Sequence, residues 1–458
     1  MRTIKHDLGL RIVKFLPILL ATIPFALCWY LFFADNIITP FFNKGNWAII
    51  ALFVIFYVTL ARIYDGFTIS LYKISEMAYS QCLAVLVADG IMFIILWLLN
   101  HVFPNIVPCL VTLLVQMILV SLWAWGAQKW YYRTFPPAKT ALVYGRSQNL
   151  ATMVQAYQLG KKFDIQMAKP VSEWLENLEL LDGYEAAFIY GVPSHERNVI
   201  LKYCMLRDIS VYFLPRIGDI ILGGARRLHM FHLPVFRVDR WNPHPEYKFV
   251  KRLFDVVLSV LVLVLTSPVM LVTALIIKAT DGGPVFYKQN RLTKDGKIFR
   301  LIKFRSMRVD AEKDGVARLS TGDKDDRITP IGRFIRKVRI DELPQLLNIL
   351  SGSMSIVGPR PERPEIAAQY EQTLPEFRLR LQVKAGLTGY AQVFGKYNTT
   401  PYDKLQMDLM YIANPSFVED LKILFATVKI LFQPESTDGI AEGQTTAAEE
   451  KEMVGAGK

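Results

Sequence analysis

Long apolar runs near the N-terminus constrain the fold most. A backbone that crosses lipid must satisfy its own hydrogen bonds, so such runs form helices. The first run is too long for a signal peptide and lacks a small-residue cleavage site, so we predict a retained membrane helix. Together the runs predict a four-helix transmembrane domain over residues 1–135, with spans at 15–34, 45–61, 81–100 and 106–127. Basic residues cluster before the first span, between the second and third spans, and after the fourth. This places both ends of the bundle in the cytoplasm.

A different pattern fills residues 139–245. Short apolar runs alternate with helical segments from Ala141 to Leu214, which is typical of a parallel α/β sheet. Gly145 stands alone in the first turn, where a dinucleotide fingerprint has three glycines. Lys169 occupies the place of the expected acid. We therefore predict a Rossmann-like domain that does not bind NAD and serves regulation or assembly.

A fifth apolar run, residues 256–277, contains Ser267 and Pro268 at its middle. By length it could span the membrane, but the stretch after it is rich in Lys and Arg, which the positive-inside rule keeps in the cytoplasm. Proline removes a backbone hydrogen bond and kinks a helix. We therefore favour a re-entrant helix over residues 251–278, broken at Ser267 and Pro268. A kinked span is the alternative.

Charged residues gather in the segment RKVRIDELPQLLNILSGSMSIVGPRP, residues 336–361. We interpret Asp341 as a helix N-cap and Glu342 as a residue of the first helical turn. Arg336 lies upstream and Arg360 downstream, and LIKFRSM adds Lys303 and Arg305. Acids at a helix start among guanidinium groups suit phosphoryl chemistry, although an ordinary capped helix is the simpler alternative.

The composition indicates the kind of partner and the setting. The net charge of +12 predicts phosphate-rich partners. Because 52% of the residues are hydrophobic, the chain is too apolar to be wholly soluble, which agrees with membrane segments. Phe377 and its apolar neighbours alternate with Arg378, Arg380 and Lys384, which predicts a segment at an anionic membrane surface. The tail, residues 434–458, is predicted to be disordered.

From about Lys248 to Phe432 the chain resembles the bacterial sugar transferases, which are polyprenyl-phosphate sugar-1-phosphate transferases. The matching motifs are, in order, GPVFYKQNR, KFRSM, DELPQLLNILSGSMSIVGPRP, KAGLTGYAQV and DLMYI. Ala385 stands where the family usually has Pro, and Thr293 where a Gly is common. The four spans and the α/β domain resemble the long form of the family.

The resemblance implies a membrane α/β protein in which residues 248–433 form a monotopic α/β catalytic domain, seated by the re-entrant helix. It implies Asp341 as nucleophile, Glu342 as a Mg²⁺ ligand, and Arg336 and Arg360 as phosphate-binding residues. Lys303 and Arg305 are further candidates for phosphate binding.

The implied activity transfers hexose-1-phosphate from a UDP-hexose to undecaprenyl phosphate. UMP is released, and the step begins capsule, exopolysaccharide or O-antigen synthesis. We favour glucose, with galactose as the alternative sugar.

We expect the chain in the bacterial cytoplasmic membrane with its active site on the cytoplasmic face. The expected partners are the two substrates, membrane lipid and a second copy in a homodimer, without nucleic acid. Two alternatives stay open: direct attack by the lipid phosphate with Asp341 as general base, and a non-enzymatic membrane scaffold or sensor.

Overall fold

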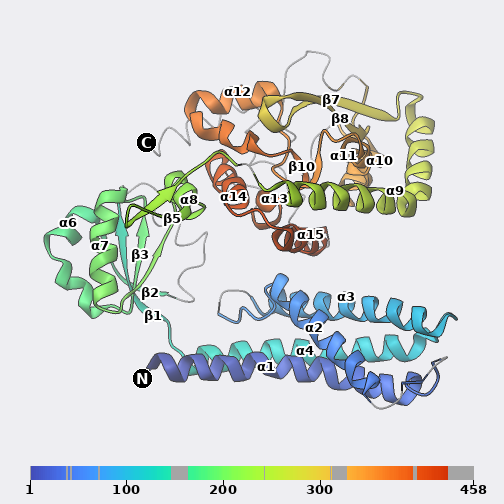
Figure 1. Ribbon diagram of the computed structural model, residues 1–458, viewed down its shortest axis with the longest axis horizontal. Coiled ribbons are helices and arrows are strands. Elements are labelled where there is room, and N and C mark those ends of the chain that lie inside the picture. Colours follow the sequence, from blue (N-terminus) through green and yellow to red (C-terminus); the bar gives the residue numbers. More distant parts are fainter. Residues whose placement is uncertain are drawn as a thin grey trace. The chain divides into compact units, whose positions relative to one another are not determined.

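A computed structural model of the chain describes residues 2–37, 40–41, 44–70, 73–145, 163–241, 243–309, 311, 327–395 and 400–431. Its contacts separate into two compact units, Met1–Leu214 and Pro215–Lys458. Figure 1 shows the elements of both units. The tail predicted to be disordered, and the helical segment predicted after the first strand of the sheet, lie outside the described residues.

The first unit begins with apolar helices. They are α1 (Arg2–Cys28), which continues as the π-helical turn η1 (Trp29–Phe33), α2 (Gly45–Ile63), α3 (Ile74–Asn100) and α4 (Ile106–Thr134). Each predicted span overlaps one helix that is long and apolar enough to cross a membrane. α1 packs against α2 and α4, and α3 packs against α2 and α4. Polar side chains bond between them: Tyr57 donates to Gln81 at 2.6 Å, and Gln116 donates to the Ala21 carbonyl at 2.7 Å. Such bonds satisfy polar groups in an apolar setting.

A parallel sheet follows in the first unit. Its strands are β1 (Ala138–Tyr144), β2 (Phe163–Pro170), β3 (Ala186–Tyr190) and β4 (Ser210–Phe213), in the order β2-β1-β3-β4. The helices α6 (Val171–Glu176) and α7 (Ser194–Leu206) and the 3₁₀ turn η3 (Leu178–Gly183) accompany it. The parallel sheet agrees with the prediction. Lys169 pairs with Glu173 at 3.2 Å.

The second unit is a mixed α/β assembly. Its early elements are α8 (Ile217–Gly223), the hairpin β5 (Arg226–Met230) and β6 (Leu233–Arg237), α9 (Pro245–Asp281), and the hairpin β7 (Phe286–Leu292) and β8 (Ile298–Phe304) joined by η4 (Lys294–Gly296). Its later elements are α10 (Pro330–Lys337), η6 (Ile340–Glu342), α11 (Gln345–Leu350), β9 (Ser355–Val357), α12 (Pro364–Thr373), η7 (Pro375–Gln382), β10 (Gly386–Thr388), α13 (Tyr390–Phe394), α14 (Pro401–Ala413) and α15 (Phe417–Leu431). β9 and β10 pair in parallel.

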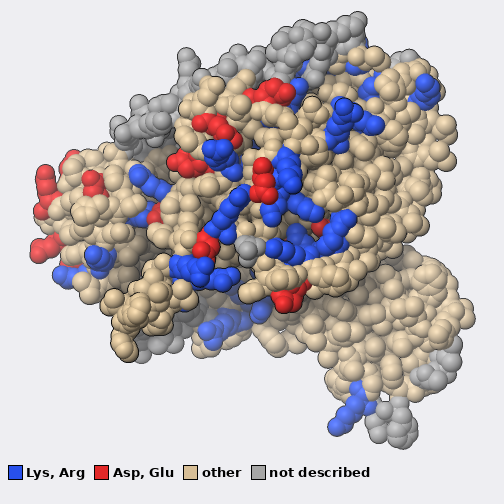
Figure 2. All heavy atoms as spheres, turned by 45° about the horizontal axis from the view of Figure 1, so that its top comes forward, with Lys and Arg blue, Asp and Glu red and all other residues tan. Residues whose placement is uncertain are grey.

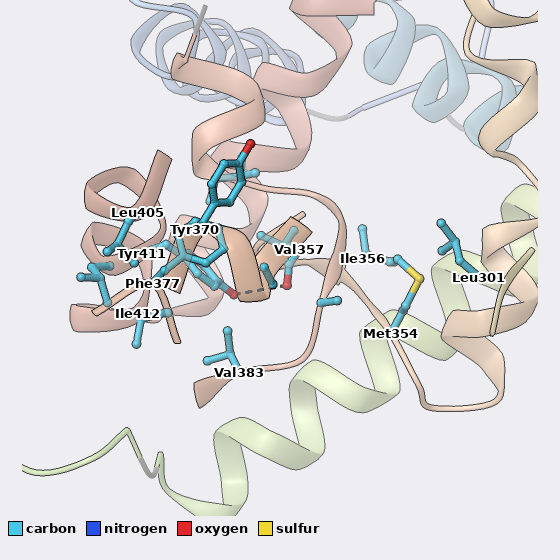
Figure 3. Close-up of a cluster of buried hydrophobic side chains, with 14 of the residues drawn as sticks. Leu301, Met354, Ile356, Val357, Tyr370, Phe377, Val383, Leu405, Tyr411 and Ile412 are labelled. Atoms are coloured by element: carbon cyan, nitrogen blue, oxygen red, sulfur yellow. Dashed lines mark hydrogen bonds between the residues drawn. The ribbon is translucent and has the colours of Figure 1, made fainter. Parts of the chain in front are cut away.

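The main core of this unit gathers residues that are far apart in sequence. Figure 3 shows Tyr370 of α12, Phe377 of η7 and Tyr411 of α14 in this cluster. The rings of Tyr370 and Phe377 meet edge to face with centroids 5.1 Å apart. Phe377 and Arg380 are buried, so the predicted membrane-surface role of this segment is wrong for both residues. The cause is packing: the 3₁₀ geometry of η7 turns these two side chains inward together.

The helix α9 is 37 residues long and bends sharply before it reaches β7 (Figure 1). Pro268 lies inside it and has no N–H for the carbonyl of Val264, four residues earlier. The hydroxyl of Ser267 donates to that same carbonyl at 2.8 Å and so replaces the missing bond. A proline kink with a serine substitute is one of the recognised causes of a helix bend.

Both arms of α9 pack on the second unit. The arm before the bend lies on the main core through Phe254, Leu258 and other side chains. The arm after the bend buries Ile277 against Phe304 and Ile335 in a smaller core. The helix ends at Gly282, whose left-handed φ of 69° a residue with a side chain would adopt only under strain.

Polar contacts fix the first arm. Lys251 pairs with the buried carboxylate of Asp420 at 2.7 Å. Arg252 donates to the carbonyls of Ile349 and Leu350 at the end of α11, at 2.6 and 2.7 Å. A cation at a helix C-terminus satisfies carbonyls that have no partner within the helix. The first arm is therefore attached to α11, the helix that follows Asp341 in the chain.

The two departures from the family pattern meet in space. The hydroxyl of Thr293 accepts a hydrogen bond from the N–H of Ala385 at 3.2 Å and donates to the carbonyl of Ser353 at 2.8 Å. A proline at 385 would have no N–H to donate, and a glycine at 293 would have no hydroxyl to accept it. The two changes therefore supply the donor and the acceptor of one hydrogen bond.

Candidate active site

Asp341 lies in a tight turn between two helices. α10 ends at Lys337, Arg339 adopts a left-handed conformation with φ of 60°, and the 3₁₀ turn Ile340–Glu342 follows. The prediction that Asp341 is a helix N-cap is wrong, because α11 begins at Gln345 and Pro344 is its N-cap residue. The left-handed Arg339 turns the chain before α11 begins, so both acids lie in the 3₁₀ turn. The Asp341 side chain therefore does not cap α11.

Glu342 is surrounded by cations. Its Oε1 lies 2.9 Å from Arg360 Nη2, 3.5 Å from Lys303 Nζ and 3.7 Å from Arg339 Nη1. Burial alone would raise the pKa of this carboxyl, but the charges of Arg360, Lys303 and Arg339 outweigh it and hold the pKa well below its usual range. The Glu342 carboxylate therefore gathers three cations around one oxygen.

Asp341 is in the opposite state. It is 8% exposed, and no residue that the structure describes forms a hydrogen bond or ion pair with its carboxyl. Burial and the neighbouring charge of Glu342 raise the pKa of Asp341 to about 6, against the pull of Lys303 and Arg336. Two adjacent carboxyls with pKa values moved apart are typical of sites where one acid reacts and the other organises charge.

The elements that carry the cations are attached to one another. Asn348 of α11 accepts from the N–H of Ile302 and donates to the carbonyl of Arg300, both at 2.9 Å. This places the end of β8, and with it Lys303, beside the turn that holds Asp341 and Glu342. Burial lowers the pKa of Lys303, while the charge of Glu342 raises it. The lysine is thus held close to the acids by the fold.

Hydrogen bonds to the backbone fix the position of Arg360. Its backbone carbonyl accepts a hydrogen bond from Arg380 at 2.9 Å, and Arg380 pairs with the buried Asp408 at 2.8 Å. Arg291 donates to the carbonyl of Pro361 at 3.1 Å. These contacts fix the Gly-Pro-Arg-Pro corner so that the Arg360 side chain meets Glu342.

The structure brings together most of the predicted site residues. Asp341, Glu342, Lys303 and Arg360 form one cluster, and Arg336 acts on it through its charge. Arg305 differs: β8 ends at Phe304, and the Arg305 guanidinium packs against Gly283 with the side chain 7% exposed. The charges that most shift the pKa of Asp341 and Glu342 come from other residues than Arg305. Its role as a phosphate ligand stays a prediction.

The sequence patterns did not identify the two residues, Arg380 and Asp408, that fix the backbone of Arg360. Arg380 and Asp408 lie 28 residues apart in the chain, and neither is next to the acidic pair. The one usable signal was the acid of DLMYI within an apolar helix, because a buried acid requires a cationic partner. Nothing in the local pattern identified which of the many arginines that partner would be.

The cluster can bind a strongly anionic group. Two acids face four cations, Lys303, Arg336, Arg339 and Arg360. Basic side chains also gather around isolated acidic ones on the face drawn in Figure 2. An excess of positive charge around a reactive carboxylate lowers the repulsion that an incoming pyrophosphate would meet. The arrangement therefore suits nucleophilic attack at phosphorus.

Comparison with known proteins points to the same chemistry. Residues 246–434 match the model of the family described as "Bacterial sugar transferase". The chain is 43% identical over 224 residues to the UDP-glucose:undecaprenyl-phosphate glucose-1-phosphate transferase of Escherichia coli K12, which covers 48% of each chain. It is 38% identical over 234 residues to an Aeromonas hydrophila UDP-N-acetylgalactosamine-undecaprenyl-phosphate N-acetylgalactosaminephosphotransferase, with 50% of this chain and 54% of the relative covered.

A shorter relative is covered almost completely. The chain is 42% identical over 187 residues to the exopolysaccharide production protein PSS of Rhizobium leguminosarum bv. phaseoli, which covers 39% of this chain and 92% of that protein. The matches to the two longer relatives, by contrast, span about half of their length.

Proposed function

This chain belongs to the bacterial sugar transferases, and on that premise we propose that it transfers hexose-1-phosphate from a UDP-hexose to undecaprenyl phosphate. UMP is the other product. The reaction would be the first membrane step in building a capsule, exopolysaccharide or O-antigen. The E. coli and A. hydrophila relatives are both named for a UDP-sugar and undecaprenyl phosphate, which supports the two substrate classes.

The unpartnered carboxyl of Asp341 carries this proposal. In the first step a carboxylate oxygen of Asp341 attacks the sugar-bearing phosphorus, the bond from that phosphorus to the oxygen shared with UMP breaks, and UMP leaves with that oxygen. In the second step an oxygen of the lipid phosphate attacks the same phosphorus and the Asp341 carboxylate is released. One phosphoanhydride replaces another, so the enzyme has mainly to lower the barrier.

The cations have a defined part in both steps. Arg360, Lys303 and Arg336 would stabilise the negative charge that accumulates as the pyrophosphate is attacked, because preorganised charges stabilise a transition state without reorganising. Glu342 holds Arg360 and Lys303 through its ion pairs. Arg380 and Asp408 act indirectly, by fixing the backbone of Arg360.

The acidic side chains of the site could supply some of the ligands of a Mg²⁺ ion. Among the described residues no group of three or more His, Cys, Asp or Glu side chains could hold a metal ion. Mg²⁺ does not need such a group, because it commonly binds one or two carboxylates and completes its shell with water and substrate phosphates. The ion pairs of Glu342 all end on Oε1, so its Oε2 would be the protein ligand. When bound, the ion would neutralise pyrophosphate charge.

Glucose is the favoured sugar. Relatives from E. coli, Klebsiella pneumoniae and Xanthomonas campestris carry names that specify UDP-glucose, whereas a Salmonella typhimurium relative is named for galactose. The two sugars differ at one hydroxyl, so one or two hydrogen bonds decide between them. The homodimer, the domain boundaries and the absence of a nucleic-acid partner stay predictions.

The proposed reaction predicts a burst. We expect purified protein incubated with UDP-glucose and Mg²⁺, without lipid, to release UMP in an amount stoichiometric with enzyme, and EDTA to prevent this. Labelled UMP should then exchange into UDP-glucose. Direct attack by the lipid phosphate would give neither burst nor exchange, and a scaffold would form no product from any sugar of a UDP-hexose panel with undecaprenyl phosphate.

We also propose that α9 is a re-entrant helix in the cytoplasmic leaflet of the bacterial inner membrane. A straight 37-residue helix would be about 55 Å long and would separate its ends across the bilayer. Support comes from its two arms, which both pack on the second unit. Side chains near the bend, such as Leu265 and Leu271, are more than 60% exposed and would face lipid.

Accessibility labelling tests this topology. Single cysteines would be placed at two exposed positions, Glu246 in the first turn of α9 and Lys297 in the hairpin that follows it. We expect both to react with a membrane-impermeant maleimide only after the inner membrane of spheroplasts is opened. Reaction of Lys297→Cys in sealed spheroplasts would show that α9 spans the membrane instead.

A further inference from the structure

The bend of α9 forms one side of a wide, open apolar hollow. It is lined by α9 residues on both sides of the bend, from Leu263 to Ala274, and by Phe286 and Phe304 of the β7–β8 hairpin. Its volume is about 530 Å³, and it opens to the surface. We call it the elbow hollow. It lies within the second unit and shares no residue with the cluster around Asp341.

The lining has the character of a site for a hydrocarbon. Ser267 is the one polar residue among those that line it, and its hydroxyl is already bonded to the Val264 carbonyl. Phe286 and Phe304 stack with centroids 5.4 Å apart and form an aromatic wall. Pockets that are concave, apolar and preformed are the usual binding places of apolar ligands. No charged side chain lines the hollow to anchor a phosphate, so a head group would have to bind elsewhere.

The cationic cluster around Asp341 is separated from the hollow by one layer of side chains. The small core beside the hollow contains Phe304, Ile335 and Ile340, and also Met270 and Ala274, which line the hollow. Each of the first three is the immediate sequence neighbour of a site residue, namely Lys303, Arg336 and Asp341 respectively. Successive side chains of a strand point to opposite faces, so Lys303 and Phe304 lie on the two faces of β8. The small core therefore lies between the hollow and the cationic cluster.

We propose that the elbow hollow binds the phosphate-proximal isoprene units of the lipid acceptor. This rests on the proposed function. The acceptor phosphate must reach Asp341 for transfer, and the chain attached to it then has the hollow as an apolar surface within reach. A membrane phospholipid has no such requirement, because its own phosphate need not enter the site. Continuity between the cationic cluster and the apolar hollow thus favours the polyisoprenyl chain as the occupant.

Binding can be tested without turnover. A polyprenyl phosphate that carries a diazirine near its phosphate would be irradiated with the full-length protein in detergent free of phospholipid, and the labelled peptides identified by mass spectrometry. We expect labels between Leu263 and Ala274 or on the β7–β8 hairpin, and we expect undecaprenyl phosphate to compete them away. Labels confined to other segments would overturn the proposal, whether or not the enzyme is active.

Kinetics give a second, independent test. Ala274→Leu and Leu271→Trp narrow the hollow, whereas Leu275→Trp is a control on the same arm, equally exposed and outside the lining. We expect both hollow variants to raise KM for undecaprenyl phosphate about tenfold. UMP release without lipid should be unchanged, which also shows that these variants fold.

The outcomes separate the possible explanations. An equal rise in KM for Leu275→Trp, or no rise for either hollow variant, would overturn the proposal. So would a rise that occurs in phospholipid nanodiscs but disappears in phospholipid-free detergent, because the occupant would then be an acyl chain of the membrane. Failure of the wild type to release UMP without lipid would contradict the covalent step of the proposed function, and the labelling result alone would then decide on the hollow.

Discussion

Asp341→Asn is expected to abolish the burst of UMP, with a loss of more than about 10³-fold in the rate of the first step. An amide has no anionic oxygen to attack phosphorus, and removal of a nucleophile is among the most damaging changes to an enzyme. The measurement is UMP released per enzyme during the first turnover with UDP-glucose and Mg²⁺. Glu365→Gln, which neutralises an exposed acid of the same unit, should leave the burst intact.

Asp341→Asn should also be more stable than the wild type. Misfolding would then be excluded as the cause of the lost UMP burst. Burial raises the pKa of Asp341 from 3.8 to about 6, so the folded protein binds this proton more tightly than the unfolded chain. Its contribution to stability is therefore present below pH 4 and is lost as pH rises through 6. We expect Asp341→Asn to raise the unfolding temperature at pH 8 and to change it little at pH 4. A burst that survives in Asp341→Asn would remove Asp341 from the role of nucleophile.

Arg360→Ala is expected to lower kcat/KM for the UDP-hexose by about 10²- to 10³-fold, the usual effect of removing one preorganised charge. The reason is twofold. Arg360 is the closest cation to Glu342, at 2.9 Å, and its charge also helps to ionise Asp341. Arg360→Lys should recover only part of the loss, because an ammonium group cannot reproduce the geometry of the guanidinium.

A pH profile separates this role from a purely structural one. In the wild type the first step should accelerate as pH rises through about 6, where Asp341 ionises. Loss of the Arg360 charge should move that midpoint to higher pH. Arg300→Ala removes an exposed arginine from β8 and should shift neither the midpoint nor kcat/KM. An unmoved midpoint in Arg360→Ala would mean that Arg360 does not act on the reacting carboxyl.

Sequence patterns predicted the membrane helices and the parallel sheet because each depends on local information. A run of apolar residues and an alternation of strands with helices are both visible within a short window. The acidic pair and Arg360 were also found from sequence, because they belong to one continuous motif. Lys303 was assigned from a second motif, and the structure brings it to 3.5 Å from Glu342.

The failures arose where the outcome depends on distant parts of the chain. The sequence favours a helix cap at Asp341 because nothing in a non-glycine residue such as Arg339 indicates a left-handed conformation. It favours a membrane-surface position for Arg380 because the partner of Arg380, Asp408, lies in another helix. The hydrogen bond between Thr293 and Ala385 likewise joins two loops, so each departure from the family pattern looked like a defect when considered alone.

The Ser267–Pro268 pair favours the bent form of α9 over a straight helix. In a straight helix the ring of Pro268 would collide with the Val264 carbonyl, at a cost of about 3 kcal/mol or more, whereas in the bent helix that oxygen is already satisfied by serine. Removing the proline alone would lift this local penalty, while the packing of both arms on the second unit would still hold the bend. If α9 enters and leaves one leaflet, as we propose, a substitution at position 268 that overcame this packing would turn α9 into a bilayer-crossing segment and move the catalytic half away from its nucleotide supply.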